Sequence, residues 1–147
     1  MKKIALGFVA GLLLLRLGAA EAKWLTDLPS AQVKAKAENK MVLLDFTGSD
    51  WCGWCIKFKK EVLDTTEFGD YAAKNLLLVE VDFPNKKTQS ADLKKANKAL
   101  GSKYGVDGYP TFVVLNQDGK EIGRQSGYDS GGPAGFIAKL EKFKAKK

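Results

Sequence analysis

"GSDWCGWCIKFKKEV", residues 48–62, holds both cysteines of the 147-residue chain and two of its three tryptophans. Cys52 and Cys55 follow a short apolar run and stand three residues apart at the start of a predicted helix. Residues three apart share one face of a helix, so the two thiols are expected to lie side by side. Such a pair has three interpretations: a zinc site, a structural disulfide or a redox-active dithiol.

The first two interpretations are weakened by composition and spacing. A structural zinc site takes four ligands, usually cysteine and histidine, and the chain has two cysteines and no histidine. No metal site within one chain is therefore expected, and Cys–His hydrolytic chemistry has no imidazole base. A disulfide that closes so small a ring contributes only about 2 kcal/mol on the chain-entropy estimate, which disfavours a purely structural bridge.

A redox-active dithiol fits the position of the pair. Free backbone N–H groups and the dipole at a helix start favour a thiolate, and cysteines there have pKa values of about 3.5–7.5 rather than about 8.5. Cys52 is expected to be the exposed nucleophile, with Cys55 one turn deeper as the resolving thiol. No nucleotide-binding pattern accompanies them, so no cofactor is expected beyond the Cys52–Cys55 disulfide.

Residues 1–22 are predicted to be a secretory signal peptide. A basic start is followed by an apolar run over 4–15 and by the small-x-small sequence "AEA" that ends at residue 22. The alternative is a membrane anchor, but Arg16 interrupts the apolar stretch, which is shorter than the roughly 20 residues of a spanning helix. Residues 23–147 are then one domain, exported to the periplasm or another extracytoplasmic compartment, with no stable membrane span after cleavage.

The chain is basic, with a formal net charge of +7. Its lysines are spread out, and no basic stripe carries interleaved aromatic residues, so nucleic-acid binding is not expected. The charge weakly favours acidic partners or an anionic membrane surface.

Apolar segments alternate with helical patterns and predict an α/β domain with a central mixed β-sheet flanked by helices on both faces. Ser30 is the expected N-cap of the first helix, and a single helical pattern follows the cysteines. The expected elements in chain order are an edge strand near 24–27, a helix over 29–40, a strand over 41–46, a helix after the cysteines, a strand over 76–83, a helix from 90 to about 101, a hairpin over 111–125 and a closing helix from 133.

Three segments together resemble the thioredoxin superfamily. "LLDFTGSDWCGWC" is similar to the family's strand and W-C-x-x-C site, and "YGVDGYPTFVVL" (residues 104–115) to its cis-proline loop and strand. "DGKEIGRQSGY" and the closing helix are similar to the last hairpin and helix. The resemblance covers about residues 24–144 and implies a thioredoxin fold. It is closest in form to small exported bacterial proteins, some described as thiol:disulfide interchange proteins.

The resemblance also implies a substrate-binding surface around the cysteines. The Tyr109–Pro110 bond is expected to be cis, with the Tyr109 backbone available to pair with an extended substrate peptide; the alternative is a trans proline that starts a strand. Trp51 is expected beside the active site, unless it is an ordinary core aromatic. Between the cysteines, thioredoxin has a proline and disulfide isomerases have a histidine, whereas this chain has Gly53 and Trp54. In the family this dipeptide helps to set the reduction potential, so the potential is left open.

Asp45 resembles the family's buried acid, which relays a proton to the second cysteine. It lies seven residues before Cys52, one more than in thioredoxin, so residues 48–50 are expected to form a longer loop. The alternative for Asp45 is an ordinary partly buried acid. Glu80 stands where thioredoxin has a lysine, and two carboxylates that approach each other should raise one pKa.

The sequence therefore predicts an exported thiol–disulfide oxidoreductase that exchanges disulfides with protein substrates, in the reductase or isomerase direction. Electrons pass to or from a partner reductase or oxidase, and we expect a monomer. The alternative is a thioredoxin-fold binding or chaperone-like module without redox turnover. A peroxidase is a weaker alternative, because the family's T-x-x-C arrangement is absent.

Overall fold

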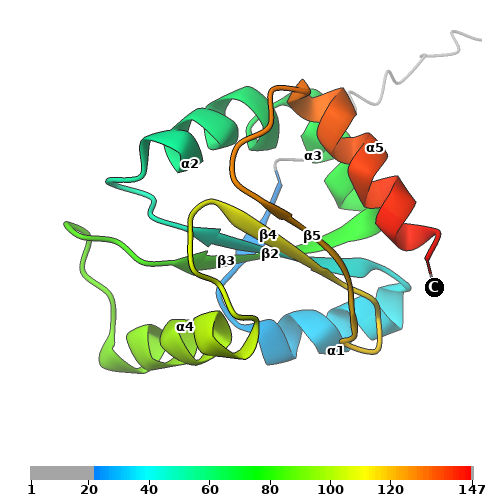
Figure 1. Ribbon diagram of the computed structural model, residues 1–147. Helices are drawn as coiled ribbons and strands as arrows, with labels where there is room; N and C mark the ends of the chain where they lie inside the picture. The colour runs from blue at the N-terminus through cyan, green and yellow to red at the C-terminus, as the bar shows by residue number, and fades with distance from the viewer. Residues whose placement is uncertain (1–21, 147) are drawn as a thin grey trace, which may run out of the picture.

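One five-stranded sheet organises the protein, with strand order β1-β3-β2-β4-β5. The computed structural model describes residues 22–146, so the predicted signal peptide lies almost wholly outside the described residues (Figure 1). The strands are β1 (Trp24–Leu25), β2 (Met41–Thr47), β3 (Leu76–Asp82), β4 (Thr111–Leu115) and β5 (Glu121–Ser126). β3 pairs in parallel with β1 and β2, whereas β4 is antiparallel to both β2 and β5. The predicted mixed sheet is confirmed.

Helices cover both faces of the sheet, as predicted (Figure 1). They are α1 (Leu28–Glu38), α2 (Gly53–Phe58), the π-helical turn η1 (Lys59–Leu63), α3 (Thr66–Asn75), α4 (Ala91–Lys103) and α5 (Gly132–Lys144). α1 and α4 lie below the sheet in Figure 1, and α2, α3 and α5 lie above it. Within the described range, no helix is both long enough and apolar enough to cross a membrane.

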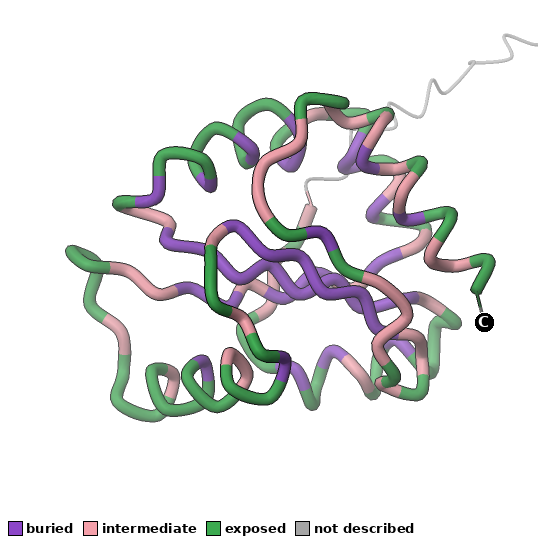
Figure 2. Tube along the Cα trace, in the orientation of Figure 1, coloured by how far each residue is buried: buried purple, intermediate pink, exposed green. Residues whose placement is uncertain are grey.

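The nearly continuous apolar run of β2 suits it to the middle of the sheet, where both of its faces are covered. Every residue of β2 is buried. Met41 and Leu43 pack into the apolar cluster beneath α3 and α5, while Val42, Leu44 and Phe46 pack against α1 on the opposite face. Figure 2 shows the buried strands between helices whose outer sides are exposed. Because β2 is rigidly held on both faces, the loop at its C-terminal end is attached to a fixed support.

Two local predictions were wrong. Asp27, not Ser30, caps α1, because its carboxylate accepts a hydrogen bond from the Ser30 N–H at 2.9 Å. The segment after the cysteines is not one helix: α2 and η1 end near Asp64, and α3 begins anew where the Thr65 hydroxyl accepts from the Phe68 N–H at 3.3 Å.

Candidate active site

Cys52 and Cys55 lie at the start of α2, immediately beyond the C-terminal end of β2. They form a disulfide, with their Cα atoms 5.3 Å apart. Cys52 is the N-cap residue, and its sulfur accepts a hydrogen bond from the Cys55 N–H at 3.2 Å. That N–H would stabilise negative charge on the Cys52 sulfur after reduction.

In the disulfide form both cysteines are largely covered, with 7% of Cys52 and 5% of Cys55 exposed. In this form, with its sulfur bonded to Cys55, Cys52 is therefore less exposed than predicted. Its neighbours form the surface instead: Gly53 is exposed, as are 45% of Trp51 and 58% of Trp54. A substrate that approaches the disulfide must first contact these neighbours.

Trp51 is anchored at the edge of the site. Its indole N–H donates to the Phe83 carbonyl at 2.7 Å, and its ring packs edge-on against Tyr109 with centroids 5.9 Å apart. The indole also lies directly over Gly48, where a Cβ atom would stand 2.5 Å from the ring. Trp51 is thus neither a core residue nor a free surface residue, and it joins the cysteine loop to the loop that carries Pro110.

The longer loop predicted before Cys52 is tied to the segment that follows β3. The Asp50 carboxylate accepts three backbone N–H groups, from residues 85–87, at 2.7–2.8 Å. These bonds, led by the one from Asn85, lower the pKa of Asp50. Ser49 donates through its backbone and hydroxyl to Asp82 at 2.9 and 2.5 Å. Sequence reasoning did not assign these roles, although an aspartate and a serine in a loop are the residues expected to bind backbone N–H groups.

Trp54 is held on the other side of the disulfide. Its ring stacks on Tyr128, with centroids 5.1 Å apart, and the Lys57 ammonium lies 5.4 Å from the Trp54 ring and 4.9 Å from the Tyr128 ring. The Tyr128 hydroxyl donates to Glu61 at 2.5 Å. Trp54 therefore presents a fixed apolar surface beside the cysteines.

The Tyr109–Pro110 peptide bond is cis. The Pro110 carbonyl accepts from the Gly127 N–H at 2.7 Å, whereas within residues 22–146 the Tyr109 backbone makes no hydrogen bond. Pro110 is buried and Tyr109 is half-buried. The Tyr109 main chain is thus a free pairing edge next to Trp51.

Asp45 is buried beneath the site, with 7% of its surface exposed and no hydrogen-bond partner for Oδ1 within the described chain. β2 and β3 align it with Glu80. Burial, followed by repulsion from Glu80 and Asp82, raises the pKa of Asp45 to about 8. Burial also raises the pKa of Glu80, with a further contribution from Asp82. The predicted approach of the two carboxylates is present, and its effect is to favour the protonated form.

A small cavity connects Asp45 with the second cysteine. Its volume is about 20 Å³, and Cys55, Asp45, Glu80 and Lys59 all line it. A space of that size holds about one water molecule. Asp45 is therefore a buried acid that lines the same cavity as Cys55, and this cavity has room for about one water molecule.

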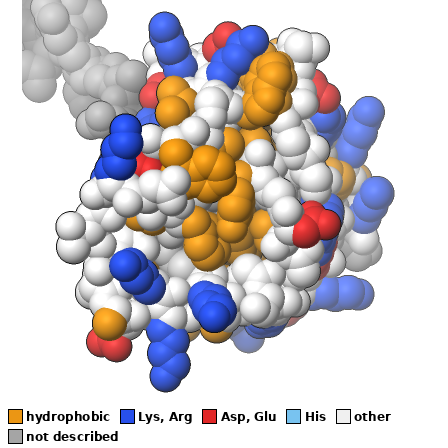
Figure 3. Space-filling view, turned by 60° about the vertical axis from the view of Figure 1, so that its left-hand side comes forward, with side chains coloured by type: hydrophobic (Ala, Val, Ile, Leu, Met, Phe, Trp, Pro, Cys, Tyr) orange, Lys and Arg blue, Asp and Glu red, His pale blue; other side chains and the backbone are white. Residues whose placement is uncertain are grey.

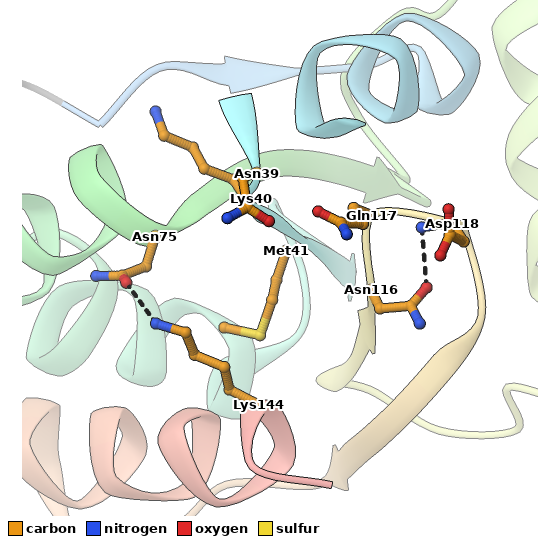
Figure 4. Close-up of a pocket in the computed structure, with 8 residues that line it drawn as sticks. All are labelled: Asn39, Lys40, Met41, Asn75, Asn116, Gln117, Asp118 and Lys144. Atoms are coloured by element: carbon orange, nitrogen blue, oxygen red, sulfur yellow. Dashed lines mark hydrogen bonds between the residues drawn. The ribbon is translucent and has the colours of Figure 1, made fainter. Parts of the chain in front are cut away.

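A larger hollow, of about 260 Å³, lies at the opposite end of β2 (Figure 4). Two hydrogen bonds join residues of its lining: the Lys144 ammonium donates to Asn75 at 3.1 Å, and the Asp118 N–H donates to Asn116 at 3.0 Å. Met41 at its floor begins β2, whereas the cysteines follow the end of that strand. This hollow therefore takes no part in dithiol chemistry.

The sheet order and the layers of helices are those of the thioredoxin fold. Residues 28–144 match the family described as a thioredoxin-like domain, so the chain belongs to that family. It is a protein-disulfide oxidoreductase of the thioredoxin superfamily, and the predicted family and fold are confirmed.

Among curated relatives, the disulfide bond reductase DsbH of Chlamydia pneumoniae is 37% identical over 85% of this chain and 74% of its own length. A solved structure titled DsbH oxidoreductase has a TM-score of 0.79 and 36% identity, over 84% of this chain and 85% of that one. The thiol:disulfide interchange protein DsbD of Pasteurella multocida is 33% identical over 78% of this chain, but the match spans only 18% of its length.

Proposed function

We propose that the protein is an exported reductase of protein disulfides, with Cys52 as the attacking thiol and Cys55 as the resolving thiol. The observation that carries the proposal is the dithiol at the start of α2, with the unpaired Tyr109 backbone beside it. The similarity to a disulfide bond reductase supports the reducing direction over the isomerase direction.

The reaction runs in two exchanges. The Cys52 thiolate attacks one sulfur of the substrate disulfide, a mixed disulfide forms, and the other substrate sulfur leaves as a thiolate. Cys55 then loses its proton and attacks the Cys52 sulfur, which releases the second substrate thiolate and forms the Cys52–Cys55 disulfide. The substrate gains two electrons, which a partner reductase must return to the protein.

In this proposal the ionised form of Asp45, which is the minor form below about pH 8, is the base that receives the Cys55 proton. The two groups line the same cavity, with room for one bridging water. Proton transfer is efficient when donor and acceptor have similar proton affinities. The pKa of about 8 for Asp45 lies close to the ordinary cysteine value of about 8.5, so Asp45 is matched to this task.

Substrate binding falls to the residues that surround the disulfide. The exposed apolar surfaces of Trp51 and Trp54 flank the cysteines, and Gly53 leaves the space between them open. The Tyr109 backbone would pair with an extended segment of the substrate, and Pro110, which lacks an N–H, holds that edge. Figure 3 shows apolar side chains gathered at the centre of this face, with Lys and Arg side chains around them.

The proposal also includes a signal peptide at residues 1–22 that directs export to an extracytoplasmic compartment. There the protein acts as a monomer on protein thiols and disulfides. N-terminal sequencing of the exported protein tests the cleavage site.

The equilibrium reduction potential tests the direction of electron flow. It is measured in glutathione buffers from the fluorescence of Trp51 and Trp54, which flank the disulfide. A value near about −270 mV supports a reductase, whereas a value near about −120 mV would identify an oxidant and overturn the proposed direction. Acceleration of insulin reduction by wild type but not by Cys52→Ser tests the activity itself.

A further inference from the structure

The π-helical turn η1 begins at Lys59, four residues after the second cysteine of the dithiol. It closes where the Asp64 N–H donates to the Lys59 carbonyl at 2.9 Å, five residues back instead of the four of an α-helix. Short π-helical turns within helices occur frequently at functional sites. Neither the family resemblance nor the proposed chemistry assigns a role to this turn.

The π-helical turn brings Lys59 and Asp64 together. In an α-helix the side chains three or four residues apart are neighbours, whereas those five apart point in different directions. Here the wider turn aligns residues five apart, and the Lys59 ammonium donates to the Asp64 carboxylate. The two side chains are 53% and 52% exposed. Because an ion pair so exposed contributes little to stability, support of the fold does not explain this arrangement.

Lys59 also lines the cavity of about 20 Å³ that Cys55 shares with Asp45 and Glu80. Among the lining residues in the described part of the chain, Lys59 is the only one with a positive charge. Burial and the neighbouring carboxylates raise the pKa of Asp45, and the positive charge of Lys59 acts in the opposite direction. The ammonium therefore lies between an exposed acid, Asp64, and the buried acid of the proposed proton transfer.

The other groups that face Asp45 carry no positive charge. On β3 these are Glu80 and Asp82, which both disfavour a second negative charge. On β4 the neighbour in register is the apolar Phe112, and on α2 it is Cys55, which lines the same cavity. Lys87 acts on Glu80, and its ammonium donates to Ser49 at 3.0 Å. Within residues 22–146, the cation that acts on Asp45 is therefore Lys59.

We propose that Lys59 is a positioning residue for the second exchange: its ammonium stabilises the ionised carboxylate of Asp45, and Asp64 sets how strongly it does so. The inference rests on the proposed function, because it deepens the role given there to Asp45. In this step the Cys55 S–H bond breaks and the Asp45 carboxylate takes the proton. The sulfur electron pair forms the bond to the Cys52 sulfur, and the substrate thiolate leaves. Lys59 keeps its proton throughout.

The second exchange is followed with 2,2′-dithiodipyridine, in an excess that makes the first exchange the faster one. The Cys52 thiolate attacks this disulfide, forms a pyridyl mixed disulfide and releases one pyridine-2-thione. Cys55 then attacks the Cys52 sulfur, the Cys52–Cys55 disulfide forms, and a second pyridine-2-thione leaves. Stopped-flow absorbance separates the two releases. The second release is intramolecular, so its rate constant does not depend on how much of a variant is folded.

Lys59→Met should lower the rate constant of the second release about twofold at pH 6–7 and low salt, because the ionised fraction of Asp45 falls more than its basicity rises. The difference should shrink well above pH 8, where Asp45 is ionised in both proteins, and in 1 M salt. Lys59→Arg keeps the charge and should match wild type. Lys60→Met is the matched control, at an exposed lysine of the same turn that does not line the cavity. An unchanged rate in Lys59→Met, or an equal loss in Lys60→Met, would overturn the proposal.

Asp64→Asn should change the rate in the opposite direction. Without the Asp64 carboxylate the charge of Lys59 is no longer neutralised, so the second release should become about twofold faster at pH 6–7. The same substitution added to Lys59→Met should have little effect, because the ammonium through which Asp64 acts is gone. An equal acceleration in both backgrounds would show that Asp64 does not act through Lys59 and would contradict the assignment.

The ionisation of Asp45 is measured directly from its carboxyl-carbon NMR signal in the oxidised protein, where neither cysteine titrates. The midpoint of this titration should move to a pH about 0.5 higher in Lys59→Met and should not move in Lys60→Met. A midpoint that stays in place contradicts the proposal. A midpoint that moves while the second release keeps its wild-type rate also overturns it, because Lys59 then takes no part in the proton transfer.

Insulin reduction separates this inference from the proposed function. If wild type reduces insulin and Lys59→Met shows the wild-type rate of second release at every pH, the role of Lys59 is wrong and the reductase stands. If wild type fails to reduce insulin, the proposed function itself is wrong.

Discussion

Asp45→Asn should stabilise the oxidised protein, and the gain should grow with pH. The pKa of this carboxyl is raised in the fold from its ordinary 3.8 to about 8, mainly because burial disfavours the charge. Between these two values the folded state keeps a proton that the unfolded chain releases. The free energy of unfolding of wild type therefore falls as pH rises from about 4 to about 8, and this contribution is complete only below the unfolded pKa.

The size of the effect follows from the displacement of the pKa. At pH 7 the pH is about three units above the pKa of the carboxyl in the unfolded chain. At 1.36 kcal/mol per unit, keeping this carboxyl protonated in the folded state lowers the free energy of unfolding by about 4 kcal/mol. Asparagine has a similar shape and does not titrate. We expect the variant to exceed wild type by less than about 1 kcal/mol at pH 4 and by about 4 kcal/mol at pH 7.

Urea unfolding of the oxidised proteins between pH 4 and 8 measures this difference, since disulfide-bonded cysteines do not titrate. Asp70→Asn, at an exposed aspartate on α3, is the matched control for the chemical change itself. Glu80→Gln should make the pH dependence of wild type less steep, because repulsion from Glu80 is the second cause of the raised pKa. A gain that is constant across pH, or a loss of stability, would refute the reasoning.

Three further substitutions test local packing and hydrogen bonding, two of them at the cysteine loop and one in α5. Gly48→Ala should lower the melting temperature by several degrees, because the new Cβ would stand 2.5 Å from the Trp51 indole; an unchanged melting temperature argues against that packing. Gly135→Ala lies in α5, where the new Cβ would meet no atom within 4 Å, so it should stabilise the protein by up to about 1 kcal/mol in thermal unfolding. A loss of stability would show that the space around residue 135 is not open. Asp50→Ala should speed amide hydrogen exchange at residues 85–87 while leaving α5 unchanged, and equal exchange in both proteins would show that the carboxylate does not hold that segment.

The main elements of the fold could be predicted from the sequence because their signals are local. Met41–Thr47 is a buried strand in the structure and an apolar run in the sequence, and α4 (Ala91–Lys103) begins within one residue of the helix start predicted at residue 90. The break between η1 and α3 was missed, because residues 56–75 keep apolar residues at helical spacing. The cap at Thr65 was the available signal, and its effect depends on how both segments pack beneath α5.

The candidate site was predictable where spacing alone decides it. Cys52 and Cys55 are close because they are three residues apart, and Asp45 is buried because its strand is central. The Asp50 contacts with residues 85–87 and the Asn97 contact with Asp82 join segments distant in sequence. No local pattern specifies such pairs, so they could be found only in the folded structure.

Trapping with single-thiol variants tests the central claim most directly, namely that Cys52 attacks substrate and Cys55 resolves the mixed disulfide. Reduced Cys55→Ser and Cys52→Ser are each mixed with oxidised insulin, and the adducts are measured by mass spectrometry. The account predicts a lasting mixed disulfide at Cys52 in Cys55→Ser and little adduct in Cys52→Ser. Equal trapping by the two variants, or trapping mainly at Cys55, would contradict it.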